Sequence, residues 1–225
     1  MEDQVMGKWM LALVVLAGLP GEAPAAGEKP RYYGAGELNI AGAALGMKPG
    51  EVAVALTKAG YSRVEQIRGI SWEEKISIEL AASGSKARPK AYNQGILSER
   101  YSKGQEEVEV SYLPVPAGAA VHVVTYRIRR TAMTPTAFTA SVIARYGKPT
   151  VSLSQESVYC SVGEEACSPT DFPQRKQLPS LTVALGDYHA LTLRLVAGAK
   201  AERDYSASVK DELARRVPQV KRPTF

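Results

Sequence analysis

Two cysteines and two histidines are the residues of this chain whose types and spacing point most directly to chemistry. Cys160 and Cys167 enclose six residues. In an oxidising compartment two thiols this close most often pair, and the loop-closure model gives about 2.5 kcal/mol of stabilisation for so small a ring. A redox-active pair is the alternative, but it prefers C-x-x-C at the start of a helix. The spacing therefore predicts a structural disulfide that pins one local loop.

The two histidines lie far apart in the sequence. His122 falls in a β-branched run, where alternation places it on the same face as Val124 and Tyr126 and predicts a packed or edge position. His189 follows Asp187 in a predicted turn. A His–Asp pair can orient a general base, but no nucleophile motif accompanies this one. Neither histidine therefore predicts a catalytic centre.

Ser83 and Lys86 match the S-x-x-K pattern of penicillin-recognising enzymes. In those enzymes the serine starts a helix, whereas here the motif falls where a helix is predicted to end, and no S-D-N or K-T-G follows. Three adjacent pairs of glutamates are spread along the chain without metal-ligand spacing to a histidine. The sequence therefore predicts no catalytic residue, no cofactor and no metal site, although distant carboxylates could still meet in three dimensions.

Charge and tyrosine content suggest a binding surface instead. Lys plus Arg number 28 against 23 Asp plus Glu, which gives a net charge of +5, and there are 11 Tyr and only 3 Phe. Tyr112, Tyr126, Arg127 and Arg129 lie in or at the ends of predicted strands, and aromatic anchors with arginine are typical of partner surfaces. Solvated charge and half-buried sheet tyrosines are the alternative explanation. We expect a partner that is another envelope protein or an anionic envelope component.

The N-terminal residues resemble a targeting signal. Lys8 precedes the apolar run 9–19, and a small-x-small site ends at Ala25. This layout predicts a signal peptide over residues 1–25 and a periplasmic or secreted protein, with an uncleaved anchor or a buried helix as the alternative. The run is too short for a membrane span, which needs about 20 residues, so we expect no transmembrane helix in the mature chain. Export argues against nucleic acid as a partner.

The first half of the mature chain contains predicted helices and then strands. After a flexible lead-in over 26–36, Pro49 suits the first position of a helix that Gly60 ends. Residues 71–82 begin with a capping-box pattern and fit a helix, although a strand also fits their apolar spacing. The region 91–130 alternates apolar and polar residues between short turns, which predicts an antiparallel meander.

The second half repeats this order. Thr134 and Pro135 begin a predicted helix that stops near Gly147, and predicted strands follow over 151–159, 181–185 and 190–196. Asp204 is a candidate cap for a last helix. The sequence thus predicts an α+β protein of two tandem modules, 37–131 and 132–217, each a short helix or helix pair packed on an antiparallel sheet, followed by a basic tail over 218–225. Chance similarity of two capped helices is the alternative to a repeat.

Two short motifs, LGMKPGEV over 45–52 and ARYGKPT over 144–150, resemble motifs of exported bacterial proteins. Those proteins have the fold of the beta-lactamase inhibitor protein and of the SmpA/OmlA outer-membrane lipoproteins. The resemblance covers residues 38–60 and 134–150, and it implies helix–helix–sheet modules, often in tandem, that bind proteins or act as envelope scaffolds. The second half departs from the pattern, because it lacks an evident second helix and carries the Cys160–Cys167 loop.

These features together predict an exported, non-enzymatic binding or envelope-scaffold protein. The alternative is a small periplasmic hydrolase whose site, including His122 or His189, is assembled only in three dimensions. A deep cleft that holds a histidine beside a nucleophile or carboxylate would favour the enzyme. A broad exposed aromatic patch would favour binding.

Overall fold

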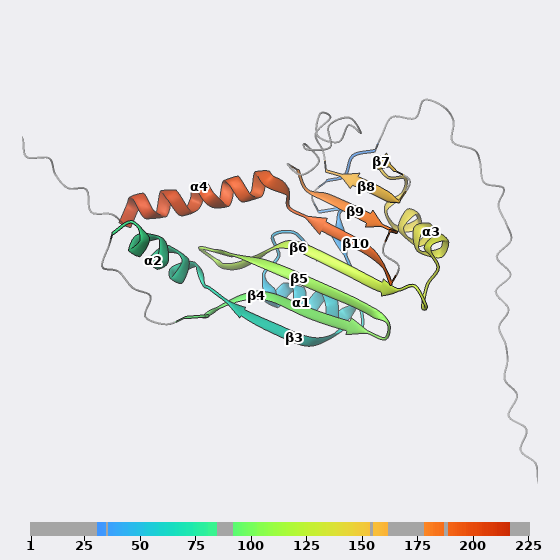
Figure 1. The fold of residues 1–225 in the computed structure, drawn as a ribbon, viewed down its shortest axis with the longest axis horizontal. Coiled ribbons are helices and arrows are strands. Elements are labelled where there is room, and N and C mark those ends of the chain that lie inside the picture. Colours follow the sequence, from blue (N-terminus) through green and yellow to red (C-terminus); the bar gives the residue numbers. More distant parts are fainter. Residues whose placement is uncertain are drawn as a thin grey trace, which may run out of the picture.

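The computed structural model describes six stretches of the chain, namely residues 31–34, 36–84, 92–153, 155–161, 178–186 and 189–216. This part is an α+β protein, as predicted, with four helices, a two-stranded sheet and an eight-stranded antiparallel sheet (Figure 1). The predicted signal peptide 1–25 and basic tail 218–225 lie outside the described residues. Within the described residues no helix is long and apolar enough to cross a membrane.

The first half begins with a small hairpin and continues with helices and long strands. Its elements are β1 (Asn39–Ile40), β2 (Ala43–Ala44), α1 (Pro49–Lys58), β3 (Ser62–Gly69), α2 (Trp72–Ala82), β4 (Gly95–Lys103), β5 (Glu106–Val115) and β6 (Gly118–Arg129). The second half starts with a helix and ends with one. Its elements are α3 (Pro135–Tyr146), β7 (Val151–Ser152), β8 (Glu156–Cys160), β9 (Ser180–Ala184), β10 (Ala190–Val196) and α4 (Gly198–Arg216).

The two halves share one sheet. Its strand order is β3-β4-β5-β6-β10-β9-β8-β7, so each half contributes four strands and the last strands of the two halves pair at the centre. That central pairing is antiparallel and places Leu193 opposite Tyr126. The order is therefore mirrored about the β6–β10 pair. Because the sheet is continuous across this pair, the division into two separate modules remains a prediction.

Local sequence signals explain where the helices begin. Pro49 and Pro135 occupy the first turns of α1 and α3, where a missing N–H costs nothing. Ser71 caps α2: its Oγ accepts the Glu74 N–H at 3.3 Å, while Glu74 Oε2 accepts the Ser71 N–H at 2.6 Å. Residues 71–82 thus hold a helix with the predicted capping box, and the strand alternative is wrong.

The main core lies on one face of the sheet, which we call the inner face. Helices α1 and α3 both pack there, through Leu56 of α1 and Phe138 of α3, against strand residues such as Val110 and Leu191. All four side chains are at most 3% exposed. The opposite side, which we call the outer face, carries the charged and polar residues that alternate with these. The inner face therefore supplies most of the buried apolar area that stabilises the fold.

Helix α4 stands apart from this core (Figure 1). It leaves the end of β10 through Gly198, whose φ of 78° suits glycine, and runs to α2 at the other end of the molecule. There Val209 packs in a small second cluster with Trp72, Ile76 and Leu80. The rest of α4 is largely exposed. The helix is thus held at its two ends.

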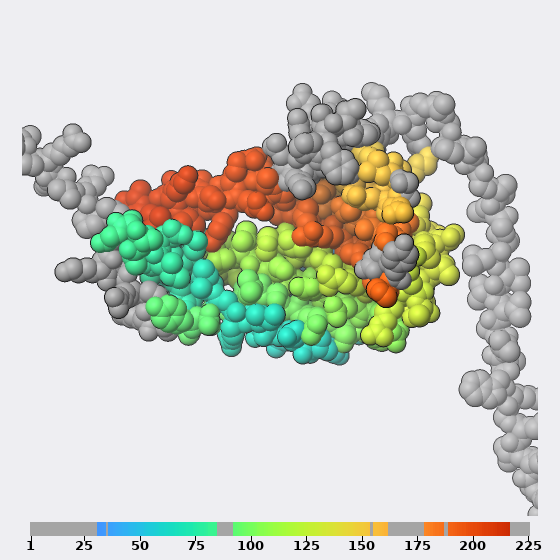
Figure 2. All heavy atoms as spheres, in the orientation of Figure 1, coloured from blue at the N-terminus to red at the C-terminus, as the bar shows by residue number. Residues whose placement is uncertain are grey.

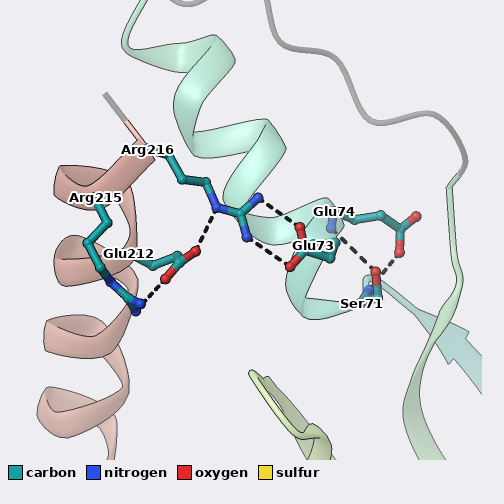
Figure 3. A network of polar contacts seen from close by, with 6 residues as sticks. All are labelled: Ser71, Glu73, Glu74, Glu212, Arg215 and Arg216. Atoms are coloured by element: carbon teal, nitrogen blue, oxygen red, sulfur yellow. Dashed lines mark hydrogen bonds and ion pairs between the residues drawn. The ribbon is translucent and has the colours of Figure 1, made fainter. Parts of the chain in front are cut away.

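A polar network ties the last turn of α4 to the first turn of α2 (Figure 3). Arg216 donates from Nη1 and Nη2 to the two carboxylate oxygens of Glu73, at 2.8 and 2.9 Å. Its Nε donates to Glu212 Oε1 at 2.6 Å, and Glu212 also pairs with Arg215. Such a two-pronged contact fixes orientation, but exposed pairs of this kind contribute at most about 1 kcal/mol.

Three elements of the structure differ from the prediction. Strand β3 is absent from the prediction, because none of its eight residues is buried and so no apolar alternation marks it. Its pairing with β4 is irregular near Val64 and Leu97. The predicted strand 151–159 is instead the hairpin of β7 and β8. The last helix starts at Gly198 rather than at Asp204.

Candidate functional site

The structure separates the four residues of the predicted partner surface. Tyr112 is 1% exposed and lies in the core, where its hydroxyl donates to Glu99 Oε2 at 2.7 Å. Tyr126 is half-buried and stacks on Phe138, with ring centroids 6.3 Å apart. Arg127 and Arg129 are exposed and alternate with inward-facing residues of β6, so they point to the outer face. The prediction of one aromatic and basic surface is therefore wrong: the tyrosines and the arginines lie on opposite faces of the sheet.

Arg127 belongs to a ladder of charges across the outer face. It pairs with Glu107 at 3.5 Å and with Glu109 at 3.1 Å, and Arg100 pairs with Glu65 at 2.7 Å. These side chains are 38–46% exposed, so each pair contributes little stability. The three carboxylates outnumber the two guanidinium groups. This part of the sheet consequently offers no excess positive charge to an anionic partner.

Glu99 is a buried carboxylate on the inner face. It is 1% exposed and accepts hydrogen bonds from Tyr112, Tyr101, Arg63 and Gln66, all at 2.7–2.9 Å. Burial alone would raise its pKa, but the four donors outweigh burial and hold the pKa below its usual value. With this many donors Glu99 is a satisfied structural anion rather than a free base.

His122 lies at an irregularity between β5 and β6. Ser111 pairs with Val123 and Tyr112 with Val121, so His122 is the extra residue of a β-bulge. The bulge breaks the alternation and puts His122 beside Val123 on the outer face. The predicted place on the face of Val124 and Tyr126 is therefore wrong.

The surroundings of His122 fix its chemistry. Its Nδ1 lies 3.1 Å from the carbonyl oxygen of Ser111, which accepts the proton of an Nδ1–H tautomer. Burial lowers the pKa of His122, which keeps the ring neutral near pH 7. In that tautomer Nε2 is left as an acceptor. Nε2 can then accept a hydrogen bond from a bound ligand, or it can take up a proton as a base.

A large cavity lies between the outer face and the start of α4, and we call it the outer cavity. Its volume is about 580 Å³, within the range of sites that hold small molecules or partner side chains. A hollow between α4 and the sheet is visible in Figure 2. Its walls come from strands of both halves of the chain and from the first turns of α4, which belongs to the second half. The lining residues are Leu113, His122, Val123, Glu156, Val158, Ser180, Thr182, Arg194, Val196, Ala197, Gly198, Ala199, Ala201 and Glu202.

A second, smaller cavity of about 200 Å³ lies on the inner face between the N-terminal hairpin and α3, and we call it the inner cavity. Aromatic side chains dominate its walls, and it contains one carboxylate and one guanidinium group. The lining residues are Ile40, Ala41, Tyr61, Glu106, Tyr126, Met133, Phe138, Ser141, Val142, Arg145, Tyr146 and Leu193.

The other candidate residues are scattered. The backbone carbonyl of His189 accepts the Arg130 N–H at 3.2 Å at the start of β10, and its predicted neighbour Asp187 lies outside the described residues. Ser83 ends α2, with its Oγ donating to the Leu80 carbonyl at 2.8 Å, and Lys86 is also outside them. Neither motif is therefore assembled within the described chain.

Cys160 is 1% exposed on β8 and packs with Val151 and Val158. Cys167 lies outside the described residues, so the Cys160–Cys167 disulfide remains a prediction. In the described part of the chain, no three His, Cys, Asp or Glu side chains gather in a way that could hold a metal ion.

Sequence reasoning missed Glu99, Glu106 and Arg145. A signal for Glu99 was present: it stands two residues before Tyr101 in a strand, and an acid at a core-facing position is rare unless it is paired. Glu106 gives the same signal ahead of Val108 and Val110. Arg145 gives none, because its hydrogen bond goes to Asn39, more than a hundred residues away in the chain.

Fold and cavities together define an α+β protein whose sheet carries a cavity on each face. Comparison of the chain with models of protein families, with curated proteins and with solved structures finds no match. The resemblance to the beta-lactamase inhibitor protein and the SmpA/OmlA proteins therefore stays a prediction.

Proposed function

We propose that the chain is an exported, non-enzymatic binding or envelope-scaffold protein and that the outer cavity holds part of its partner. One observation carries this proposal: the walls of the outer cavity come from β5 and β6 of the first half and from β8, β9, β10 and α4 of the second, so both halves of the chain build one recess. A recess at the junction of two halves is where ligands commonly bind.

The chemistry of the outer cavity favours another envelope protein as the partner over an anionic component. Its walls are mainly aliphatic, with Leu113, Val123 and Val196 among them, and suit an apolar side chain. Two carboxylates, Glu156 and Glu202, face one guanidinium group there. The cavity thus has no excess positive charge with which to attract an anion.

The finer features predicted from the sequence complete the proposal. The mirrored strand order is consistent with two tandem modules, 37–131 and 132–217, whose last strands pair. A signal peptide over residues 1–25 would deliver the chain to an oxidising compartment, where the Cys160–Cys167 disulfide forms. Mass spectrometry of exported material tests the cleavage site after Ala25 and the disulfide together.

Site-specific photo-cross-linking tests the partner site. A photoreactive phenylalanine analogue replaces Val123, which lines the outer cavity, and in a matched variant replaces Val54, which is 70% exposed on α1. We expect a discrete cross-linked partner protein from position 123, and its loss when Arg194→Glu changes the charge of the cavity. Equal cross-linking from position 54, or none from position 123, would contradict the proposal.

A hydrolase is the second candidate, because the outer cavity holds neutral His122 together with the hydroxyls of Ser180 and Thr182. Within the described residues, however, the hydrogen bond of His122 goes to a backbone carbonyl and not to a hydroxyl or carboxylate. Hydrolysis of model esters by the purified chain, abolished by His122→Gln but not by Thr192→Ala, would establish the enzyme in place of the binding protein.

A further inference from the structure

The inner cavity contains two opposite charges that do not neutralise each other. Within the described residues, no ion pair of 4.0 Å or less involves Glu106, and the same is true of Arg145. Glu106 is half-buried, where an unpaired charge is costly, whereas Arg145 is exposed to solvent. The two groups thus leave an acidic and a basic position open in one small space.

Glu106 is held in place by tyrosine hydroxyls. The Tyr61 hydroxyl donates to Glu106 Oε2, and the Tyr126 hydroxyl also interacts with this carboxylate. Burial, followed by the contact with Glu106, raises the pKa of Tyr61, and burial likewise raises the pKa of Tyr126. Both phenols therefore stay neutral and donate. They orient the carboxylate without cancelling its charge, so it can still attract a cation.

Arg145 is oriented in a similar way. Its Nη2 donates to Asn39 Oδ1 at 2.7 Å, and its guanidinium carbon lies 5.3 Å from the centroid of the Tyr146 ring. The Tyr146 hydroxyl in turn donates to the Asn39 backbone carbonyl at 2.5 Å. These contacts use part of the donor capacity of the guanidinium group. The remaining N–H groups can bind a carboxylate, for which the planar fork is well suited.

The walls between the two charges are largely aromatic, while Arg145 itself is exposed to solvent. Tyr61, Phe138 and Tyr146 are 3–6% exposed, and Tyr126 stacks on Phe138. Aromatic faces attract ammonium groups, which adds to the attraction of the Glu106 carboxylate for a cation. A volume of about 200 Å³ lies below the range of drug-sized sites and suits a ligand of few atoms.

We infer that the inner cavity binds a small zwitterion of the amino-acid type, with its ammonium group at Glu106 and its carboxylate at Arg145. This site is separate from the outer cavity and does not depend on the function proposed for it. The ligand class follows from the charges alone. An ammonium ion without a carboxylate leaves Arg145 unpaired, and a carboxylate without an ammonium group leaves Glu106 unpaired.

Isothermal titration calorimetry of the full purified chain tests this inference with three matched probes: L-leucine, N-acetyl-L-leucine, which lacks the ammonium group, and L-leucine methyl ester, which lacks the carboxylate. We expect saturable binding of leucine and binding at least about tenfold weaker for each blocked form, because each loses one charge-assisted contact. If leucine does not bind at millimolar concentration, or if a blocked form binds equally well, the inference is wrong. This comparison needs no variant and so cannot fail through misfolding.

Two variants then assign the ends of the ligand. Glu106→Gln preserves the acceptor for Tyr61 and should remove the preference for leucine over N-acetyl-leucine. Arg145→Gln should remove the preference for leucine over its methyl ester. Ser141→Ala is the control, since Ser141 lines the same cavity and its hydroxyl donates to the Ala137 carbonyl of its own helix. Equal loss in all three variants would mean a structural effect and would overturn the assignment.

Discussion

The inner and outer cavities lie on opposite faces of one sheet and are built in different ways. Tyr61, Phe138 and Tyr146, which line the inner cavity, are members of the main core. Hydrogen bonds orient its two charged groups: Glu106 accepts one from Tyr61, and Arg145 donates one to Asn39. The outer cavity is closed on one side by the start of α4, a helix in which Val209 is the buried residue within the described chain. One recess is thus part of the packed core, and the other lies under an element with few buried contacts.

This difference bears on what each site can accept. A site whose walls belong to the core changes shape only at the cost of core packing, so it selects by size and charge. A site beneath a helix anchored at its ends can open without loss of the core, because local stability follows local burial. We therefore expect the inner cavity to be selective for a small ligand and the outer cavity to adapt to a larger one.

The largest loss of stability should come from a core residue of β10, a strand with side chains on both the inner and the outer face. Leu191 of β10 is 0% exposed and packs in the inner core. Leu191→Ala should lower the free energy of unfolding by about 2–5 kcal/mol, because it removes buried carbons and leaves a cavity. Urea denaturation followed by circular dichroism measures this loss.

The neighbour of Leu191 provides the matched control. Thr192 follows it on β10, points to the outer face and is only partly buried. Thr192→Ala should cost less than about 1 kcal/mol, as is usual for substitutions outside the core. If the two variants lose equal stability, the inner face does not dominate the fold and the contrast between the cavities fails.

The next largest effect is the loss of stability at low pH through Glu99. The pKa of Glu99 lies below its usual value, so the native state favours the ionised form. Its stabilising contribution is complete above the unfolded pKa of about 4.3 and is lost as the pH falls through the lowered folded pKa. At pH 7, Glu99→Gln should cost about 1–3 kcal/mol, because it places an amide against the buried tyrosine hydroxyls.

Urea denaturation of both proteins at pH 7 and pH 3 checks this prediction. The difference in unfolding free energy between the native chain and the Glu99→Gln variant should narrow on acidification. Other carboxylates titrate in both proteins and cancel in the difference. A gap that stays constant between the two pH values would mean that Glu99 is not ionised in the native state, and the inner face would then lack its buried anion.

The sequence was sufficient for elements with strong local signals. The proline starts of α1 and α3, the Ser71–Glu74 capping box and the β4–β5–β6 meander were all predicted, because each depends on residues close together in the chain. The α+β class followed from their order. Such signals are local in origin and can be recognised without knowledge of the tertiary structure.

The cavities could not be predicted, since they depend on long-range pairing and on irregularities. The pairing of β6 with β10 brings residues more than sixty positions apart together, and no local pattern specifies it. The bulge at His122 moves that residue to the other face, because one extra residue reverses the alternation. The split of the predicted partner surface has a simpler cause: Tyr126 and Arg127 are neighbours in β6, and neighbouring residues of a strand point to opposite faces.

The smallest effect tests how α4 is held over the outer cavity. Glu73 is 67% exposed and Arg216 is 34% exposed, so their two-pronged contact lies largely in solvent. The hydrogen bond from Arg216 is the largest cause that lowers the pKa of Glu73. Glu73→Gln should weaken the anchoring of α4 by less than about 1 kcal/mol, and moderate salt should reduce the effect further.

Hydrogen exchange of the backbone amides in α4 measures this anchoring more sensitively than global unfolding does, because it reports local opening. Amides near Val209 should exchange faster in Glu73→Gln, while those of β10 stay unchanged. Glu65→Gln is the matched control, since Glu65 is also an exposed carboxylate and pairs with Arg100 of β4 at 2.7 Å. If both variants leave α4 equally protected, the apolar cluster around Trp72 alone holds the helix in place, and the outer cavity opens only when that cluster separates.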